Sequence, residues 1–155
     1  MTNIITLRNV TQDDLPIFFE HQNDPEAAKM AAFPSRDREA FMAHWAKIMA
    51  STNVMNRTIL FDGQVAGNIA SFEVEGEREI GYWLGREFWG KGIASESLKQ
   101  FLGQEVKRPL FAHVAQHNLA SRRVLEKCGF QIIHEDKWQP NPNAEEVAEF
   151  ILILK

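Results

Sequence analysis

Hydrophobic positions along this chain follow two different periods, which indicates a mixture of strands and helices. Segments in which apolar and polar residues alternate, or in which β-forming residues cluster, recur seven times between Gly-, Pro- and Asp-rich breaks. Each is expected to be a strand. The seven segments are Ile4–Arg8, Arg57–Phe61, Gln64–Val74, Glu79–Leu84, Pro109–Val114, Phe130–Ile133 and Val147–Leu154.

About four helices are expected between these strands, because apolar residues there recur at intervals of three and four. Thr11 is the predicted N-cap of the first helix, with an acidic residue three positions on, and Ser35 is the predicted N-cap of the second. The third includes Leu98 on its apolar face. The fourth opens at Asn118 and ends at Gly129, a residue type that suits the position after a helix.

Short glycine turns join the second, third and fourth predicted strands, which indicates an antiparallel meander. The connection from the fourth strand to the fifth contains a helix, so these two strands are expected to be parallel. The predicted fold class is therefore α/β in the α+β sense, with a mixed, mostly antiparallel sheet of about seven strands. A Pro- and Asn-rich loop at Lys137–Glu146 is long enough to form the lip of a functional site.

Charge and composition narrow the function classes. The chain has 17 basic and 21 acidic side chains, a net charge of −4, and this lack of a basic excess argues against a nucleic-acid partner. A cationic substrate fits the charge balance better. Cys128 is the one cysteine, which suits a reducing compartment. No run approaches the ~20 apolar residues that cross a bilayer, so we expect a cytoplasmic, single-domain protein over residues 1–155 without a membrane partner.

The segment Trp89–Ser95 is the most informative for chemistry, because it lies where a strand has ended and a helix begins. A helix start presents unpaired N–H groups and the positive end of a dipole, which attract an anion. Gly90 and Gly92 leave the backbone open to a phosphate, and Lys91 can add a charge. A strand-to-helix corner that needs glycine only for its backbone angles is the alternative. The known motifs of triphosphatases and dinucleotide-binding proteins are absent.

This loop and a later helix together resemble the GNAT acetyltransferase superfamily. The family loop [QR]-x-x-G-x-[GA] is matched at Gly92 and Ala94, with Trp89 at its first position. The family helix N-x-x-[AS], ending in K-x-G-F, is matched at Asn118, Ser121, Lys127, Gly129 and Phe130. Within the superfamily, the segments 80–84 and 89–92 are most similar to the RimL-like branch, the ribosomal-protein-alanine acetyltransferases, which acetylate protein N-termini and small amines.

The resemblance implies that acetyl-CoA is the co-substrate and that no metal is needed. Its pyrophosphate would lie on the amides of residues 90–95, and its pantetheine arm along the strand edge at 82–84. Asn118 would form a hydrogen bond near the arm, and Ser121 would lie near the sulfur. Arg122 and Arg123 are expected on a solvated helix face; the alternative is that they reach the 3′-phosphate. The expected cofactor-binding residues are Tyr82, Trp83, Leu84, Trp89, Gly90, Lys91, Gly92, Ile93, Ala94, Ser95, Asn118, Ser121 and Arg122.

Two residues are the expected catalytic groups. Glu79 corresponds to a glutamate that family members often carry on the fourth strand, where it would take the proton of the acceptor amine; a solvated carboxylate is the alternative. Leu125 stands where the family usually has a tyrosine that protonates the departing thiolate, so Ser121 is the alternative donor. Tyr82 is expected in the core or the cleft wall. His113 and His117 lie ~13 Å apart if both are on a strand, too far to share a metal.

The sequence therefore predicts an N-acetyltransferase that moves acetyl to a primary amine, a protein N-terminus or a small amine, by direct attack. Two alternatives stay open. One is a CoA-binding sensor or assembly module with weak or no turnover, and the other is an unrelated α/β protein that binds a nucleotide or phosphate. Four acidic residues flank the long loop, Glu135, Asp136, Glu145 and Glu146. Either they attract a cationic acceptor or they are ordinary surface charge. The acceptor and the oligomeric state stay open, a homodimer being possible.

Overall fold

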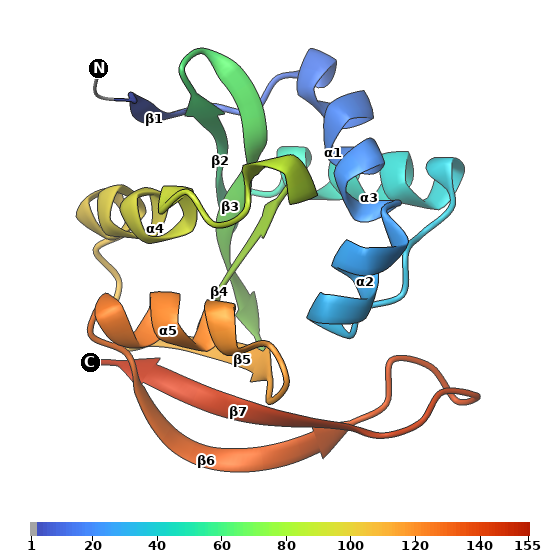
Figure 1. Ribbon diagram of the computed structural model, residues 1–155, viewed down its shortest axis with the longest axis vertical. Coiled ribbons are helices and arrows are strands. Elements are labelled where there is room, and N and C mark those ends of the chain that lie inside the picture. The colour runs from blue at the N-terminus through green and yellow to red at the C-terminus, as the bar shows by residue number, and fades with distance from the viewer. Residues whose placement is uncertain (1–2) are drawn as a thin grey trace.

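A computed structural model describes residues 3–155 and shows one mixed sheet with helices on both of its faces (Figure 1). The strands are β1 (Ile5–Arg8), β2 (Met55–Phe61), β3 (Gln64–Val74), β4 (Glu77–Leu84), β5 (Leu110–Ala115), β6 (Gln131–Trp138) and β7 (Val147–Leu154). They stand in the order β1-β2-β3-β4-β5-β7-β6. Every neighbouring pair is antiparallel except β4 and β5, which are parallel, as the sequence predicts.

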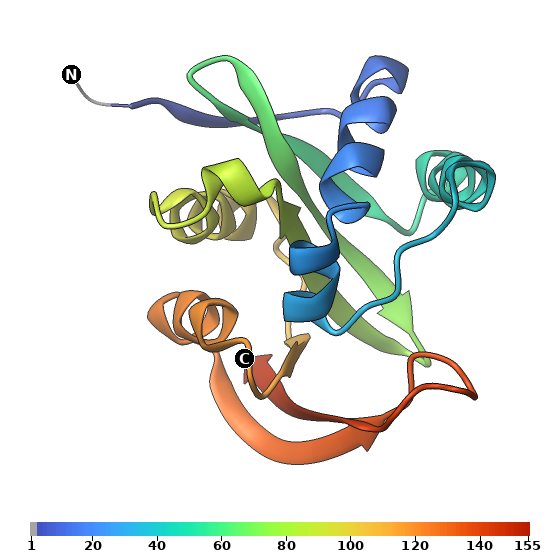
Figure 2. The ribbon, with the colours of Figure 1, turned by 45° about the vertical axis from the view of Figure 1, so that its right-hand side comes forward.

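The helices divide between the two faces of the sheet (Figure 2). One face carries α1, α2 and α3, and the other carries α4 and α5. The helices are α1 (Leu15–Gln22), α2 (Pro25–Ala31), α3 (Arg38–Ala50), α4 (Ile93–Gln104) and α5 (Leu119–Lys127), with short 3-10 turns at Gln12–Asp14 and Arg86–Phe88. No helix among residues 3–155 has the length and apolar character needed to cross a bilayer.

The N-terminal helices differ in detail from the prediction. The helix α2, which the sequence pattern does not predict, starts at Pro25, because the Asp24 side chain accepts a hydrogen bond from the Glu26 amide and Pro25 suits the first turn. The prediction of Ser35 as the next N-cap is wrong: Asp37 caps α3 by accepting a 2.7 Å bond from the Ala40 amide. Thr11 forms the predicted capping box.

Two hydrophobic clusters hold the helices to the sheet. The larger lies between the sheet and α4 and α5, with Leu98, Phe101 and Leu110 fully buried in it. The smaller joins α1 to α3, where Phe41 and Trp45 are buried; their spacing of four residues puts both on one face of α3. The two clusters fix the helix layers on opposite faces of the sheet.

The sheet opens between β4 and β5. Their parallel pairing consists of one residue pair, Glu79 with Phe111. By contrast, β4 is paired to β3 along its whole length, from Glu77 to Leu84. The two parallel strands therefore diverge after Glu79, and in the described part of the chain no strand pairs with the edge of Tyr82–Leu84 on that side.

The last hairpin is longer than predicted. The expected strand ended at Ile133, but β6 continues to Trp138 and pairs with β7 throughout, with an irregularity between Ile132 and His134. The residues that extend it are mostly charged and exposed, as suits an outer strand, and for that reason they carried no hydrophobic signal. Gly129 precedes β6 with φ +99°, which agrees with its predicted place after a helix.

Candidate functional site

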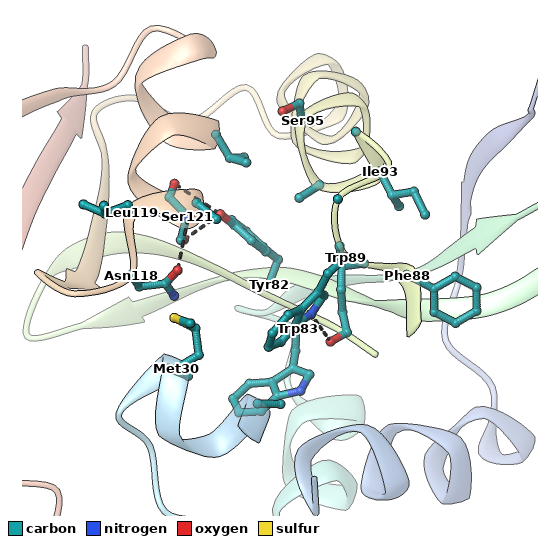
Figure 3. A pocket seen from close by; sticks show the side chains of 18 of the residues that line it. Met30, Tyr82, Trp83, Phe88, Trp89, Ile93, Ser95, Asn118, Leu119 and Ser121 are labelled. Carbon is teal, nitrogen blue, oxygen red and sulfur yellow. Dashed lines mark hydrogen bonds between the residues drawn. The ribbon is translucent and has the colours of Figure 1, made fainter. Parts of the chain in front are cut away.

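A cavity of about 600 Å³ lies beside the end of β4, where this strand has parted from β5, and its lining comes from both faces of the sheet. Tyr82 and Leu84 of β4 point toward the core beneath α4 and α5, whereas Trp83 points to the opposite face, because side chains alternate along a strand. All three line the same cavity (Figure 3). Its other walls come from α2 on one face (Ala27, Met30, Ala31) and from the starts of α4 and α5 on the other (Gly92, Ile93, Ala94, Ser95, Asn118, Leu119, Ala120, Ser121, Val124).

The loop before α4 presents open backbone to this cavity. Gly90 and Gly92 have φ of +74° and +77°, a region that other residues enter at a cost, and a Cβ added to either would meet no atom within 4 Å. Gly92 is the N-cap of α4 and offers no side chain to cap it. The first-turn amides of α4 therefore lack a capping side chain at the cavity wall, which suits an anion.

Not every residue expected at the coenzyme site lines the cavity. Lys91 is exposed and outside it. Arg122 also lies outside it, where its Nε donates to Glu126 at 3.0 Å and its guanidinium stacks over Phe150 at 5.0 Å. Trp89 is at the cavity wall, 38% exposed, and its Nε1 donates to the Leu84 carbonyl at 3.2 Å.

Asn118 and His117 fix the start of α5 at the cavity. The Asn118 side chain caps α5 by accepting from the Ser121 amide at 3.2 Å. His117 Nε2 lies 3.1 Å from the Lys29 carbonyl and 2.9 Å from the Met30 carbonyl, and because a carbonyl only accepts, Nε2 carries the hydrogen. The histidine thus ties the cavity wall at α5 to α2, a role that no local sequence signal indicates.

Two hydroxyl groups meet inside the cavity. The Tyr82 hydroxyl and Ser121 Oγ are 2.6 Å apart, and either can donate (Figure 3). Burial raises the pKa of Tyr82 to about 12, against a smaller opposing effect of the Ser121 bond, so the phenol stays protonated at neutral pH. Leu125 is 2% exposed in the main core and does not line the cavity. The sequence predicts Tyr82 in the core or the cleft wall and among the cofactor-binding residues, but it does not pair Tyr82 with Ser121, which lies 39 residues away.

Glu79 lies on the α1–α3 side of the sheet, at the last pairing of β4 with β5. Its side chain is 18% exposed, and it is not part of the cavity wall. Burial raises the pKa of Glu79, and the charges of Glu77, Glu149 and Glu75 add to this, whereas His113 lowers it. The His113 Nε2 and Glu79 Oε2 atoms are 3.5 Å apart. Within residues 3–155, no three His, Cys, Asp or Glu side chains are grouped to hold a metal ion.

Comparison with known proteins relates this architecture to acetyl transfer. Residues 5–131 match the family model described as an acetyltransferase (GNAT) domain. YdaF of Bacillus subtilis (strain 168), named provisionally as a ribosomal N-acetyltransferase, is 31% identical over 100 residues; the match covers 60% of this chain and 55% of YdaF. An FsC-acetyl coenzyme A-N(2)-transacetylase of Aspergillus fumigatus is 27% identical over 171 aligned positions, covering 91% of this chain and 72% of the relative.

Solved structures share the fold at lower identity. Spermidine N-acetyltransferase from Vibrio cholerae, in complex with CoA and spermine, superimposes with a TM-score of 0.82 at 16% identity, covering 97% of this chain and 94% of the other. A phosphinothricin acetyltransferase from Sinorhizobium meliloti, in complex with AcCoA, gives 0.82 at 17% identity, covering 97% and 87%. At these identities the likeness shows the fold alone.

Proposed function

Because this chain belongs to the GNAT acetyltransferase family, we propose that it transfers an acetyl group from acetyl-CoA to a primary amine. The observation that carries the proposal is the cavity of about 600 Å³ beside the end of β4, which is lined from both faces of the sheet. A cavity open to both faces lets a donor enter from the α4 and α5 side and an acceptor from the α2 side. We place the acceptor among protein N-termini and small amines, the RimL-like range, which the 31% identity to YdaF supports.

The residues around the cavity fit acetyl-CoA. The uncapped amides at the start of α4, with Gly90 and Gly92 beside them, suit the negative charge of the pyrophosphate. The edge of Tyr82–Leu84, which lacks a neighbouring strand, suits the two amides of the pantetheine arm, as an added strand would. Asn118 holds the start of α5 against the same gap. When bound, the coenzyme supplies an activated thioester.

Glu79 is the proposed acceptor of the amine proton. An amine attacks only when neutral, and an α-amine keeps its proton below about pH 8. A carboxylate whose pKa burial has raised is better matched to that task than an ordinary glutamate. As the nitrogen–carbon bond forms, the carbon–sulfur bond breaks and the amine proton passes to Glu79 through water, because Glu79 does not line the cavity.

The Tyr82–Ser121 pair is the proposed partner of the departing thiolate. With a pKa of about 12, the phenol is a weaker acid than a thiol of pKa near ~8.5, so outright proton transfer from it is uphill. The pair instead stabilises the thiolate by hydrogen bonding, a role that does not need a tyrosine at Leu125. The missing tyrosine therefore does not argue against acetyl transfer, and we favour a transferase over a CoA-binding module without turnover.

Two measurements test the proposed function. Calorimetry should give binding of acetyl-CoA and little binding of ATP, because the cavity suits an extended arm and the chain lacks the triphosphate motif. A coenzyme-consumption screen over N-terminal peptides, polyamines, amino sugars and amino acids should find an acceptor. Preference for ATP would overturn the coenzyme assignment; tight coenzyme binding without transfer to any amine would favour the sensor alternative.

Replacing Glu79 with Gln tests the proposed base. E79Q is expected to lower kcat at neutral pH by about 100-fold, the lower range of general base catalysis, and to remove the acidic limb of the kcat profile. The matched control is E73Q, because Glu73 is exposed on β3 and lies opposite Arg78, not Glu79, in the register of β3 and β4. An unchanged acidic limb in E79Q would remove this residue from the mechanism.

A further inference from the structure

His113 of β5 lies between two carboxylates that come from different strands. Its Nδ1 is 2.8 Å from Oε1 of Glu149 on β7, and its Nε2 is 3.5 Å from Oε2 of Glu79 on β4. The Glu149 side chain is 9% exposed, Glu79 18% and His113 35%. The imidazole therefore joins three neighbouring strands on the face that carries α1–α3, just where the sheet opens.

The positions of the two ring nitrogens restrict where protons lie. A carboxylate oxygen only accepts, so Nδ1 donates to Glu149 and keeps its hydrogen there. Nε2 then faces the Glu79 carboxylate at 3.5 Å, where an unprotonated nitrogen and an ionised oxygen would repel each other. One proton held between Nε2 and Glu79 removes this conflict. The two groups therefore titrate as a coupled pair.

The remaining charges that face this pair are acidic on each neighbouring element. Glu75 lies in the turn between β3 and β4, Glu77 on β4 and Glu149 on β7, and each raises the pKa of Glu79. Asp136 of β6 and Glu149, whose hydrogen bond is the largest effect, raise the pKa of His113. An imidazolium at His113 offsets this accumulation of negative charge and favours the ionised form of Glu79.

We propose that His113, fixed in orientation by Glu149, is a positioning residue that keeps Glu79 ionised and so sets the lowest pH at which acetyl transfer proceeds. The inference rests on the proposed function, in which the ionised Glu79 takes the amine proton. Glu149, which is buried and does not line the cavity, then has a role beyond packing: its hydrogen bond selects the ring orientation that turns Nε2 toward Glu79.

The first test is the pH profile of H113Q. The acidic limb of kcat is expected to move up by about one pH unit, the effect of removing an opposite charge beside a carboxylate. The KM for acetyl-CoA should stay within twofold, because His113 does not line the cavity. H134Q is the matched control, an exposed histidine on β6 in which neither quantity should change. An unmoved limb in a folded H113Q enzyme would overturn the proposal.

The second test needs no turnover. Nitrogen NMR of the imidazoles in the protein without coenzyme should show His113 titrating above the ordinary histidine range, with Nδ1 protonated throughout. E149Q and E79Q should each lower that titration midpoint. Ordinary titration of His113, or no response to E149Q, would overturn the proposal.

The two tests also separate this inference from the function it rests on. A shifted His113 in a protein that transfers acetyl to no amine refutes the proposed function and, with it, the role of His113 in transfer. An active enzyme whose E79Q variant loses the acidic limb, but whose H113Q variant keeps it in place, refutes the inference alone.

Discussion

At the scale of single residues, Gly92 meets two separate demands. Its φ of +77° is strained for any side chain, and as the N-cap of α4 it also leaves the cavity wall bare. Gly76, in the turn between β3 and β4, has a similar φ of +84° but does not line the cavity. A Cβ would meet no atom within 4 Å at either position. The two glycines therefore share a backbone cost and differ only in what lies next to them.

The comparison of Gly92 with Gly76 gives a prediction for acetyl-CoA binding. Gly92→Ala and Gly76→Ala should each lower the free energy of unfolding by about 1 kcal/mol, the cost of a left-handed residue with a Cβ. Only Gly92→Ala should also weaken the binding of acetyl-CoA, by about tenfold or more, because the added methyl group would hold the pyrophosphate away from the backbone amides. Calorimetry beside urea unfolding measures both. Equal effects on affinity would mean that Gly92 serves only the turn.

At the scale of elements, the close approach of β3 to β4 decides where the cavity wall stands. A Cβ added to Gly67 would lie 2.1 Å from the carbonyl oxygen of Trp83. Gly67 and Trp83 are in the paired strands β3 and β4, and Gly67 lies opposite Leu84. Neither backbone can therefore move away without losing hydrogen bonds between the two strands. Glycine at 67 is thus what lets β4 bring Tyr82 and Trp83 to the gap.

Gly67→Ala should therefore destabilise the protein by about 2 kcal/mol or more, the usual cost of forcing atoms into a packed site. Gly103→Ala is the matched control: it lies in α4, where a Cβ meets nothing within 4 Å, and it should stabilise by about 0.5–1 kcal/mol through helix propensity. Urea denaturation gives both values. A neutral Gly67→Ala would show that the two strands have room to separate.

At the scale of the whole molecule, a buried carboxylate joins the N-terminal segment to the sheet. Asp14 accepts two bonds from Arg8, at 2.7 and 2.9 Å, and a third from Thr58 of β2 at 2.7 Å. Burial alone would raise the pKa of Asp14, but these bonds, with one from the Thr11 amide, outweigh it and lower it from 3.8 to about 2. The ionised form therefore stabilises the fold.

The sign of this shift predicts the response to acid. Because the folded pKa is below the unfolded one, the stabilisation is complete above about pH 4 and is lost as the pH falls toward 2. The shift of nearly two units is worth about 2 kcal/mol. Asp14→Asn should lose that amount at neutral pH and flatten the acid limb of unfolding, whereas Asn at the exposed neighbour Asp13 should not. A parallel acid limb in Asp14→Asn would contradict this account.

The candidate site was predictable only in part. The glycine loop is one continuous stretch of sequence, and so is the helix that opens at Asn118. Each motif could therefore be found without a structure, and both segments line the cavity. Tyr82 and Ser121 are 39 residues apart, and His113 and Glu149 are 36 apart. No local pattern relates residues at such separations, and their contacts follow from which strands are neighbours.

The sequence by itself determined all seven strands and four of the helices, the meander of β2, β3 and β4, and the parallel partner of β4, since hydrophobic period, turn residues and the handedness of a crossover are local properties. It did not indicate α2 or the outer half of β6. Only the tertiary structure decided that β4 and β5 keep a single pair, that the gap opens to both faces, and that β7 inserts between β5 and β6. That insertion brings Glu149 to His113. Register and strand order depend on contacts summed over the whole sheet, so the proton-bearing groups of this site become neighbours only when the sheet is complete.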